Sequence, residues 1–217
     1  MLVKDRMSKR LITIDEDTTI MKALTIMKDN GVRRLPVIKD QKITGIVTDR
    51  DLKEATPSKA TSLDVHEIYR LLSEIKVKDI MSRDLLTIRP DESIEKAAML
   101  MLKRKISGLP VMEEGGLVGI ITETDIFRAL VDISGLARGG IKIAIELPNI
   151  PGTTQQVINM IREHGGRILS VMTSYDADKE GHRHLFVRTE IEEKILQELL
   201  DFIGKHFKVL YAKKDVI

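Results

Sequence analysis

The sequence predicts an α/β (α+β) protein, in which two copies of a β-α-β-β-α unit precede a β-α-β-β-α-β unit. Residues 3–51 recur at 77–125 with a constant offset of 74 residues, and 20 of these 49 positions are identical. Within each copy, short apolar runs alternate with segments of helical periodicity. A fixed period of this kind marks one supersecondary unit that is used twice.

The first copy sets the order of elements. Asp17-Thr18-Thr19 offers side-chain oxygens for a helix start, and Asn30-Gly31 is a typical helix end. Pro36 has no backbone donor, so we expect it at a strand end or at a gap in the ladder. The expected elements are a strand at 11–14, a helix at 20–30, strands at 35–38 and 43–47, and a helix from residue 49. The second copy predicts strands at 85–88, 109–112 and 117–121 and helices at 94–103 and from 123.

The last part of the chain follows a different pattern. Residues 134–140 contain three glycines, which mark a flexible break. Beyond them, strands are expected at 141–147, 167–175, 184–189 and 207–212, and helices at 153–164 and 191–203. The order β-α-β-β-α-β is that of the ferredoxin-like unit. The predicted domains are 1–56 (first repeat), 57–76 (helical connector), 77–133 (second repeat), 134–140 (hinge linker) and 141–217 (ferredoxin-like domain).

Composition narrows the class of function. The 217 residues are 42% apolar and 31% charged, yet the net charge is only +2, which argues against a dedicated nucleic-acid binder. The chain has no cysteine, so disulfides and thiolate metal sites are excluded. Its charged N-terminus is unlike a signal peptide, and no apolar run approaches the length of a membrane span. We therefore expect a cytoplasmic protein without a membrane or nucleic-acid partner.

One motif carries the strongest functional signal. Gly-x-x-Thr-x-x-Asp occurs at Gly45/Thr48/Asp51 and again at Gly119/Thr122/Asp125. The glycine lets another group approach the strand closely, and the threonine lies where a strand becomes a helix, whose N-terminal amides favour an anion. The aspartate can accept two hydrogen bonds from a ribose diol. The alternative is that both residues only cap a helix.

Arg33-Arg34 precedes a strand of the first repeat and is a second candidate site. Two guanidinium groups can hold a phosphate in bidentate fashion, although a solvated surface pair is the alternative. The counterparts at offset 74 are the uncharged Ser107 and Gly108. The two copies should therefore differ in how they bind phosphate.

These motifs, together with Val-x-Asp-x-Met and Leu-Pro-Val, resemble the cystathionine-β-synthase (CBS) domain, whose paired form is called a Bateman module. The resemblance covers about residues 1–133 and implies adenosine nucleotides bound in clefts between the repeats, with apolar side chains around the adenine. One implied cleft combines Thr122, Asp125, Met7, Ile12, Val32 and Arg33. The other combines Thr48, Asp51, Met81, Leu86, Ile106 and Ser107. Arg33 and Arg34 would face the phosphates.

The C-terminal residues resemble an ACT domain, a ferredoxin-like module that binds small effectors, through Asn149-Ile150-Pro151-Gly152 and the following helix. This resemblance implies an effector site at Asn149 and Gly152; a dimerising fold without ligand is the alternative. The combination of both modules resembles the AcuB family of acetoin-utilisation proteins, which implies a regulatory role in acetoin or related carbon metabolism.

We find no catalytic set, no phosphate-binding glycine loop and no metal site in the sequence. The expected function is therefore a non-enzymatic regulator, without a cofactor, that senses AMP, ADP or ATP and relays this to the ACT domain or to a partner enzyme. A homodimer is expected. The alternative function is a structural subunit that docks a partner enzyme with empty clefts.

Overall fold

The computed structural model describes residues 1–56, 70, 73–175 and 181–215. The chain forms two compact units, Met1–Ile126 and Phe127–Ile217. The division lies inside helix α5 (Glu123–Ser134), ahead of the glycine-containing segment 134–140. Each unit is described below by itself.

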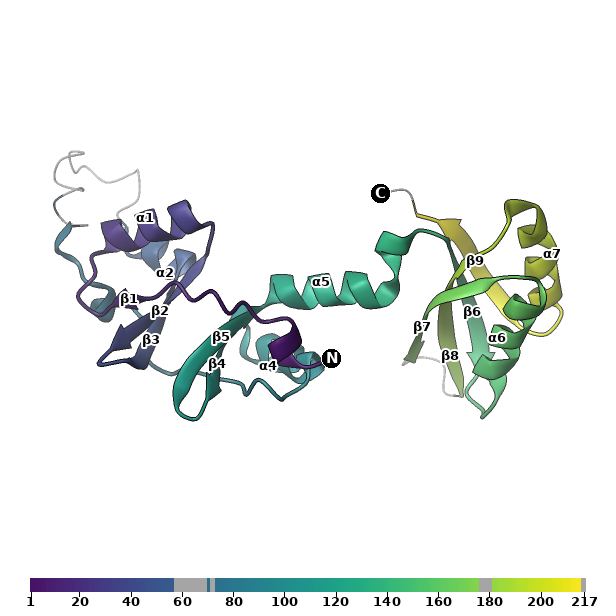
Figure 1. The fold of residues 1–217 in the computed structure, drawn as a ribbon, viewed down its shortest axis with the longest axis horizontal. Helices are drawn as coiled ribbons and strands as arrows, with labels where there is room; N and C mark the ends of the chain where they lie inside the picture. Colours follow the sequence, from purple (N-terminus) through teal and green to yellow (C-terminus); the bar gives the residue numbers. More distant parts are fainter. Residues whose placement is uncertain (57–69, 71–72, 176–180, 216–217) are drawn as a thin grey trace. The chain divides into compact units, whose positions relative to one another are not determined.

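The first repeat follows the predicted order (Figure 1). Thr19 caps α1 by accepting a hydrogen bond from the Lys22 amide (3.3 Å), and Gly31 ends this helix with φ +63°. The elements are η1 (Val3–Asp5), β1 (Ile14–Asp15), α1 (Ile20–Asn30), β2 (Arg34–Lys39), β3 (Lys42–Thr48) and α2 (Asp49–Glu54). They form a sheet of order β1-β2-β3, with β1 parallel and β3 antiparallel to β2.

The second repeat has the same elements except for its first strand. They are η2 (Val77–Asp79), α4 (Ile94–Arg104), β4 (Gly108–Glu113), β5 (Gly116–Thr122) and α5. The predicted strand at 85–88 is wrong: only one parallel bridge, Ile88 to Val111, is present. The predicted strand at 11–14 is likewise reduced to the two residues of β1. Both segments contribute one buried isoleucine to a core, Ile14 or Ile88, which explains the apolar pattern without a full strand.

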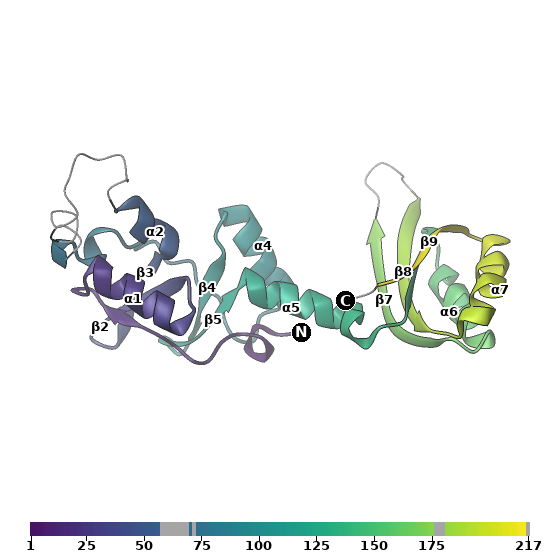
Figure 2. The ribbon, with the colours of Figure 1, turned by 90° about the horizontal axis from the view of Figure 1, so that it is seen from above.

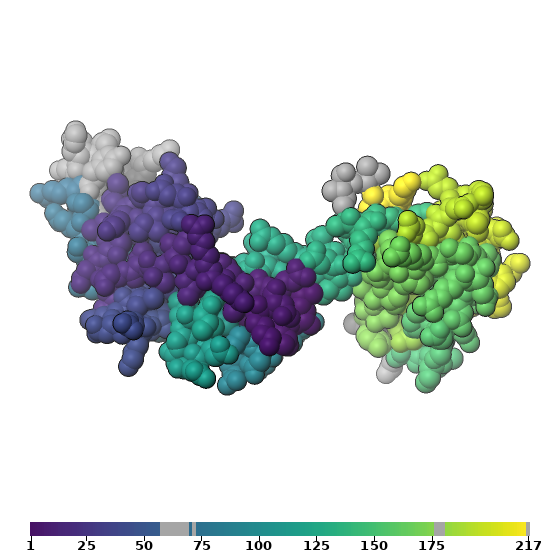
Figure 3. Space-filling view, in the orientation of Figure 1, coloured from purple at the N-terminus to yellow at the C-terminus, as the bar shows by residue number. Residues whose placement is uncertain are grey.

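The two repeats exchange short segments. Val3 and Lys4 of the first repeat donate backbone hydrogen bonds to Glu92 and Pro90 of the second (2.8 and 3.0 Å). In return, Val77 and Lys78 donate to Thr18 and Glu16 of the first repeat (2.8 and 3.1 Å). In Figure 3 the first residues of the chain, in dark purple, lie against the teal residues of the second repeat. Neither repeat is therefore complete without residues from the other.

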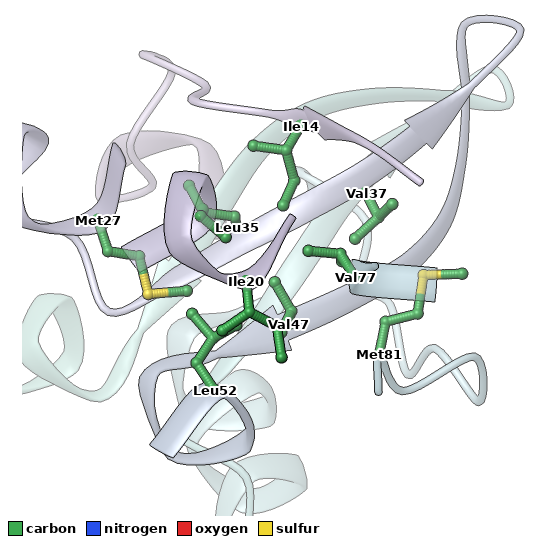
Figure 4. Packing of buried hydrophobic residues seen from close by; sticks show 10 residues of the cluster. Ile14, Ile20, Met27, Leu35, Val37, Val47, Leu52, Val77 and Met81 are labelled. Carbon is green, nitrogen blue, oxygen red and sulfur yellow. The ribbon is translucent and has the colours of Figure 1, made fainter. Parts of the chain in front are cut away.

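The core of the first repeat includes this exchanged segment. Val77 (0% exposed) and Met81 (7%) pack with Ile14, Ile20 and Val47 (Figure 4). Burial of such side chains stabilises each by about 1.5–3 kcal/mol relative to exposure. The exchange is thus held by apolar packing as well as by backbone hydrogen bonds.

A glycine in each repeat receives a methionine from the other. A Cβ atom at Gly45 would lie 2.5 Å from Met81 Sδ, and one at Gly119 would lie 2.5 Å from Met7 Sδ. The sequence predicts a close approach at both glycines, and the structure confirms it. It also identifies the approaching group, which the sequence does not.

Pro36 lies inside β2, opposite Ile46, rather than at a strand end. The backbone of Ile46 exchanges both of its hydrogen bonds with Ser82 on its other side (3.0 Å each). The proline therefore sits at a pair that needs no donor from it. The second repeat repeats this arrangement with Pro110, Ile120 and Ser8.

The second unit contains the predicted β-α-β-β-α-β order after α5 and η3 (Leu136–Arg138). Its elements are β6 (Ile141–Pro148), α6 (Thr153–Glu163), β7 (Arg167–Tyr175), β8 (His182–Glu190), α7 (Glu193–Gly204) and β9 (Lys208–Lys214). The sheet is antiparallel with the order β7-β8-β6-β9, which confirms a ferredoxin-like topology. Helices α6 and α7 lie on one face of this sheet, where they cover its apolar core (Figure 2).

The predicted connector at 57–76 falls mostly outside the described residues. Its described residue Ile75 packs against the core of the first repeat, and its carbonyl accepts a hydrogen bond from the Ile20 amide (3.1 Å). In the described ranges, no helix combines the length and the apolar character that a membrane span requires.

We predict that Gly119→Ala lowers the free energy of unfolding by about 1–3 kcal/mol, because the new methyl group meets Met7 and, at 3.1 Å, the Ser8 carbonyl oxygen. Gly116→Ala is the matched control in the same strand, since its Cβ meets only the Glu113 carbonyl oxygen at 3.5 Å. Urea unfolding of both variants measures the difference. Equal stability of the two variants would contradict the close packing of Met7 on β5.

Candidate functional site

The first Thr-x-x-Asp motif forms a capping box at the start of α2. The Oδ2 atom of Asp51 accepts hydrogen bonds from the backbone amide and the hydroxyl of Thr48, both at 2.7 Å. The Thr48 hydroxyl in turn accepts from the Asp51 amide at 3.3 Å. This reciprocal cap fixes the orientation of the carboxylate and leaves Oδ1 outside the cap.

The second motif has nearly the same geometry at the start of α5. Asp125 Oδ2 accepts from the Thr122 amide (2.9 Å) and from the Thr122 hydroxyl (2.6 Å). All four side chains are half-buried rather than sealed in the core. The capping interpretation of this motif is therefore correct, and it does not exclude a binding role, because the cap itself engages only the Oδ2 atom of each carboxylate.

The exchanged methionines bring a residue of one repeat to the motif strand of the other. Met81 lies on Gly45, three residues before Thr48, and Met7 lies on Gly119, three residues before Thr122. The CBS resemblance implies that Met7 lies with Thr122 and Asp125 and that Met81 lies with Thr48 and Asp51. The structure places each methionine on the strand that leads to that motif. A flexible thioether is well suited to packing against a planar ring.

Arg34 also crosses between the repeats. Its Nη2 atom donates a hydrogen bond to the Ser107 hydroxyl at 2.7 Å. The guanidinium lies in the space that a Cβ atom on Gly108 would occupy, so a larger residue at this position would require the Arg34 side chain to move. Burial lowers the pKa of Arg34 from its usual value, while the nearby carboxylates of Glu123 and Asp125 act to raise it. Arg34 therefore stands as a partly desolvated cation close to the second motif.

Arg33 lies elsewhere. Its side chain is exposed, and its carbonyl accepts from the Asp49 amide (2.9 Å) at the start of α2. Ser107 has the equivalent place in the second repeat, where its carbonyl accepts from the Glu123 amide at 3.2 Å. Each pre-strand residue thus lies beside the motif of its own repeat.

The structure also shows which of the implied residues pack together within each repeat. Ile12 and Val32 pack, together with Met81, on the core of the first repeat that also holds Leu52, next to Asp51. The first group is therefore Thr48, Asp51, Met81, Ile12, Val32 and Arg33. The second is Thr122, Asp125, Met7, Ser107 and the guanidinium of Arg34. Ile106 and Leu86 are half-buried in the second repeat. The pairing of Ile12, Val32 and Arg33 with Asp125 that the CBS resemblance implies is not tested by these contacts and stays a prediction.

Three contributors to the site are absent from the motifs. Glu123 faces Arg34, and Ser8 and Ser82 hold the exchanged segments on β5 and β3. The one sequence signal for the Arg34 crossing is the small residue at Gly108, where the other repeat has an arginine.

The predicted effector residues of the second unit lie in the loop between β6 and α6. Asn149 is exposed, and its backbone amide donates a hydrogen bond to the Gly181 carbonyl at 2.7 Å. Gly152 precedes α6 with φ +89°, a conformation that favours glycine. Nearby, Arg183 donates to the hydroxyls of Thr153 and Thr154 (3.1 and 2.8 Å).

The CBS domain family profile matches residues 3–58 and 77–132, which together make up more than half of the sequence. The chain belongs to the CBS domain family. The two matched ranges are the two repeats that exchange segments, so the tandem CBS pair, or Bateman module, is the first compact unit.

Curated relatives extend this assignment. A CBS domain-containing protein of Dictyostelium discoideum is 38% identical over 134 residues, which are 61% of this chain and 92% of that protein. A homoserine O-acetyltransferase of Methanosalsum zhilinae is 38% identical over 130 residues, but these make up only 24% of that enzyme. The likeness to an enzyme is therefore confined to a CBS-containing part.

Solved structures of CBS pairs are also similar. The pair of protein MJ0100, in complex with 5′-methylthioadenosine and S-adenosyl-L-methionine, has a TM-score of 0.50 and 31% identity, covering 60% of this chain and 95% of its own. CBSX2 in complex with AMP has a TM-score of 0.50 and 32% identity over 61% of this chain and 97% of its own. An acetoin utilization protein (AcuB) from Vibrio cholerae has a TM-score of 0.52 and 28% identity over 64% of this chain and 96% of its own.

We predict a coupling free energy of about 0.5–1.5 kcal/mol between Arg34→Met and Ser107→Ala in a double-mutant cycle of stability, because the two side chains share a hydrogen bond. Arg33→Met with Ser107→Ala is the control pair, since the Arg33 side chain is exposed. Chemical unfolding of the five variants and the parent supplies the energies. A coupling no larger than that of the control pair would rule out the crossing.

Proposed function

We propose that this protein is a non-enzymatic regulator that senses adenosine-containing ligands with its CBS pair. The observation that carries the proposal is the duplicated, preorganised acceptor. Each motif presents a carboxylate fixed by its own helix cap, beside a methionine supplied by the other repeat. A carboxylate oriented in this way can accept from a ribose diol, and the methionine can pack on the adenine.

The two clefts differ in their charge. The cleft of Asp125 has the half-buried guanidinium of Arg34 close by, whereas its counterpart Gly108 offers the cleft of Asp51 no cation. The proposal therefore places the phosphate of AMP, ADP or ATP at Arg34, with the ribose on Asp125. For the cleft of Asp51, the basic residue before the strand is the exposed Arg33, whose carbonyl accepts from the Asp49 amide. The adenosine ligands of MJ0100 and CBSX2 support this choice of ligand class.

Helix α5 supplies a path for the signal. It begins with Glu123, two residues before Asp125, and ends at Ser134 in the second unit. There the Ser134 carbonyl accepts hydrogen bonds from Ser170 Oγ (2.7 Å) and Arg188 Nε (3.1 Å). A ligand that changes the position of Asp125 thus acts on a helix anchored in the other unit. The ligand can shift the equilibrium between two arrangements of the helix only by the difference between its binding free energies for the two arrangements.

The biological setting in the proposal is acetoin or related carbon metabolism, and the second unit is taken as an ACT domain. The likeness to the Vibrio cholerae AcuB protein supports the first assignment. The ferredoxin-like strand order and the loop of Asn149 and Gly152 support the second. The regulated target would be a partner enzyme.

The competing function is an interaction subunit whose clefts are empty. The features that favour it are apolar side chains exposed on two helices. Met99 and Leu102 on α4 are 51% and 72% exposed, and Phe127 and Leu130 on α5 are 62% and 55% exposed. In our proposal these side chains serve instead to bind a second copy of the chain.

We predict that Asp125→Asn weakens AMP binding to the full chain by about tenfold to a hundredfold, because hydrogen bonds to a charged acceptor contribute about 1.5–3 kcal/mol each. Asp51→Asn should remove the second binding event instead. Isothermal titration with AMP, ATP and S-adenosylmethionine measures both. In the parent chain, ligand at about 100 times its Kd should raise stability by about 2.7 kcal/mol.

Asp49→Asn and Glu95→Gln are the controls, because each removes a carboxylate from the first turn of a helix in one of the repeats without touching a Thr-x-x-Asp cap. Unchanged binding in both Asp51→Asn and Asp125→Asn, or no heat with any of these ligands, would reject the sensing function in favour of the interaction subunit.

We predict that the parent chain is a dimer and that Leu102→Glu dissociates it, since a charge would be buried in an apolar interface at a cost of several kcal/mol. Light scattering after size exclusion gives the mass. Ile150→Glu is the control, as Ile150 is a 58% exposed apolar residue in the loop of the second unit. A monomeric parent chain would contradict the proposed interface. Dissociation by Ile150→Glu but not by Leu102→Glu would also contradict it.

A further inference from the structure

The sheet of the second unit has a face opposite its helices with its own chemistry. Alternation along β6 directs Ile141, Ile143 and Ile145 to the helices, so Lys142 and Ala144 lie on the opposite face. The register pairs Lys142 with Arg188 of β8 and Lys213 of β9, and pairs Ala144 with Phe186. Charged and aromatic side chains of three strands therefore meet on this face.

This face contains a hollow of about 410 Å³, lined mainly by Leu136, Lys142, Met172, Phe186, Arg188 and Asp215. We call it the sheet-face hollow. A smaller depression beside it is lined by Lys142, Tyr211, Lys213 and Asp215. The volume lies within the range of small-molecule sites. The hollow is near the start of β6, whereas Asn149 and Gly152 follow its end, so the two places are distinct.

One wall of the hollow is held rigidly by Arg188, which is 3% exposed. Its guanidinium donates to the carbonyls of Ser134 (3.1 Å) and Gly139 (3.3 Å) and to Asp215 Oδ2 (2.7 Å). The hydrogen bond from Arg188 is the largest influence on the pKa of Asp215 and lowers it. The charges of Arg188, Lys213 and Lys142 lower it further. Arg188 and Asp215 therefore satisfy one another and fix the segment from Ser134 to Gly139 against the sheet.

The lysines are left with unused charge. Within the described residues, neither Lys142 nor Lys213 forms an ion pair. The Lys142 ammonium lies 4.9 Å from the centroid of the Phe186 ring, which keeps it over the floor of the hollow. The floor itself is apolar, with Phe186 and Met172 opposite each other on β8 and β7. An anionic group at Lys142 would thus have its organic part on these two side chains.

We propose that the sheet-face hollow binds a small organic anion, a carboxylate or phosphate ester with a compact apolar body. Lys142, assisted by Lys213, binds the anionic head. Phe186 and Met172 pack against the apolar body, and the Arg188–Asp215 pair positions the wall. A cation is disfavoured there, because three basic side chains face one carboxylate that is already paired.

The test uses the full chain labelled with ¹³C in its methionine methyl groups, with the Met172 signal assigned by Met172→Leu. Benzoate and phenyl phosphate are the anionic probes, and benzamide is the neutral analogue of benzoate. Titration should shift the Met172 signal with at least one anion. Benzamide and the Lys142→Gln variant should each bind about tenfold more weakly, since a charge-assisted hydrogen bond is lost.

Lys194→Gln is the matched control, because it removes the same charge from the exposed start of α7 in the same unit. Phe186→Leu, which retains an apolar side chain, should weaken the aromatic probes but not alter folding. Equal binding of benzoate and benzamide, or full retention of binding in Lys142→Gln, would overturn the proposal. A Met172 signal that moves with protein concentration alone would also overturn it, as the face would then be covered by a second copy.

Discussion

The reciprocal exchange of segments between the two CBS repeats is the interaction on which the rest of the first unit depends. Ile46 and Ile120 each direct both backbone hydrogen-bonding groups away from their hairpin, and these groups are satisfied only by Ser82 and Ser8 of the exchanged segments. A buried backbone group without a partner is costly, so the hairpins require one another. The methionines that follow the same exchange fill the space above the two glycines. A single repeat would therefore lack part of its core and part of its candidate site.

The internal symmetry is broken at one position with a clear physical consequence. Arg34 and Gly108 are equivalent in the two repeats, and the side chain of one occupies the space that the other leaves vacant. Two arginines could not share this space, because their volumes and charges would conflict. Arg34 is therefore a cation close to Glu123 and Asp125. The equivalent residue, Gly108, has no side chain and provides no such cation for Asp51. The two matched motifs of a duplicated unit thus have unlike surroundings.

The second unit is organised around a different constraint. Its helices cover one face of the sheet, and the opposite face carries Arg188, which is buried only because the turn from Ser134 to Gly139 and Asp215 supply acceptors for it. Those acceptors belong to the end of α5 and to the residue after β9. The last turn of α5 is therefore tied to the sheet by side chains, and movement of that helix would alter the wall of the sheet-face hollow.

Local relationships in this protein could be predicted from the sequence alone. The period of 74 residues, most of the helices and strands, the ferredoxin-like order and the Thr-x-x-Asp caps depend on neighbours within a few residues. Composition and periodicity report such neighbours directly. The family resemblance added the candidate ligand and the acceptor residues. Pairings between distant residues were decided only by the tertiary structure. Residues 85–88 have the apolar pattern of a strand but lack a neighbouring strand along most of their length. Pro36 is tolerated inside a strand because the opposite residue, Ile46, forms both of its backbone hydrogen bonds with Ser82. The crossing of Arg34, the placement of Val32 and Arg33 beside the motif of their own repeat, and the meeting of Lys142 with Phe186 also depend on side chains far apart in the chain. No local pattern encodes these contacts, since each depends on how a complete core positions its surface residues.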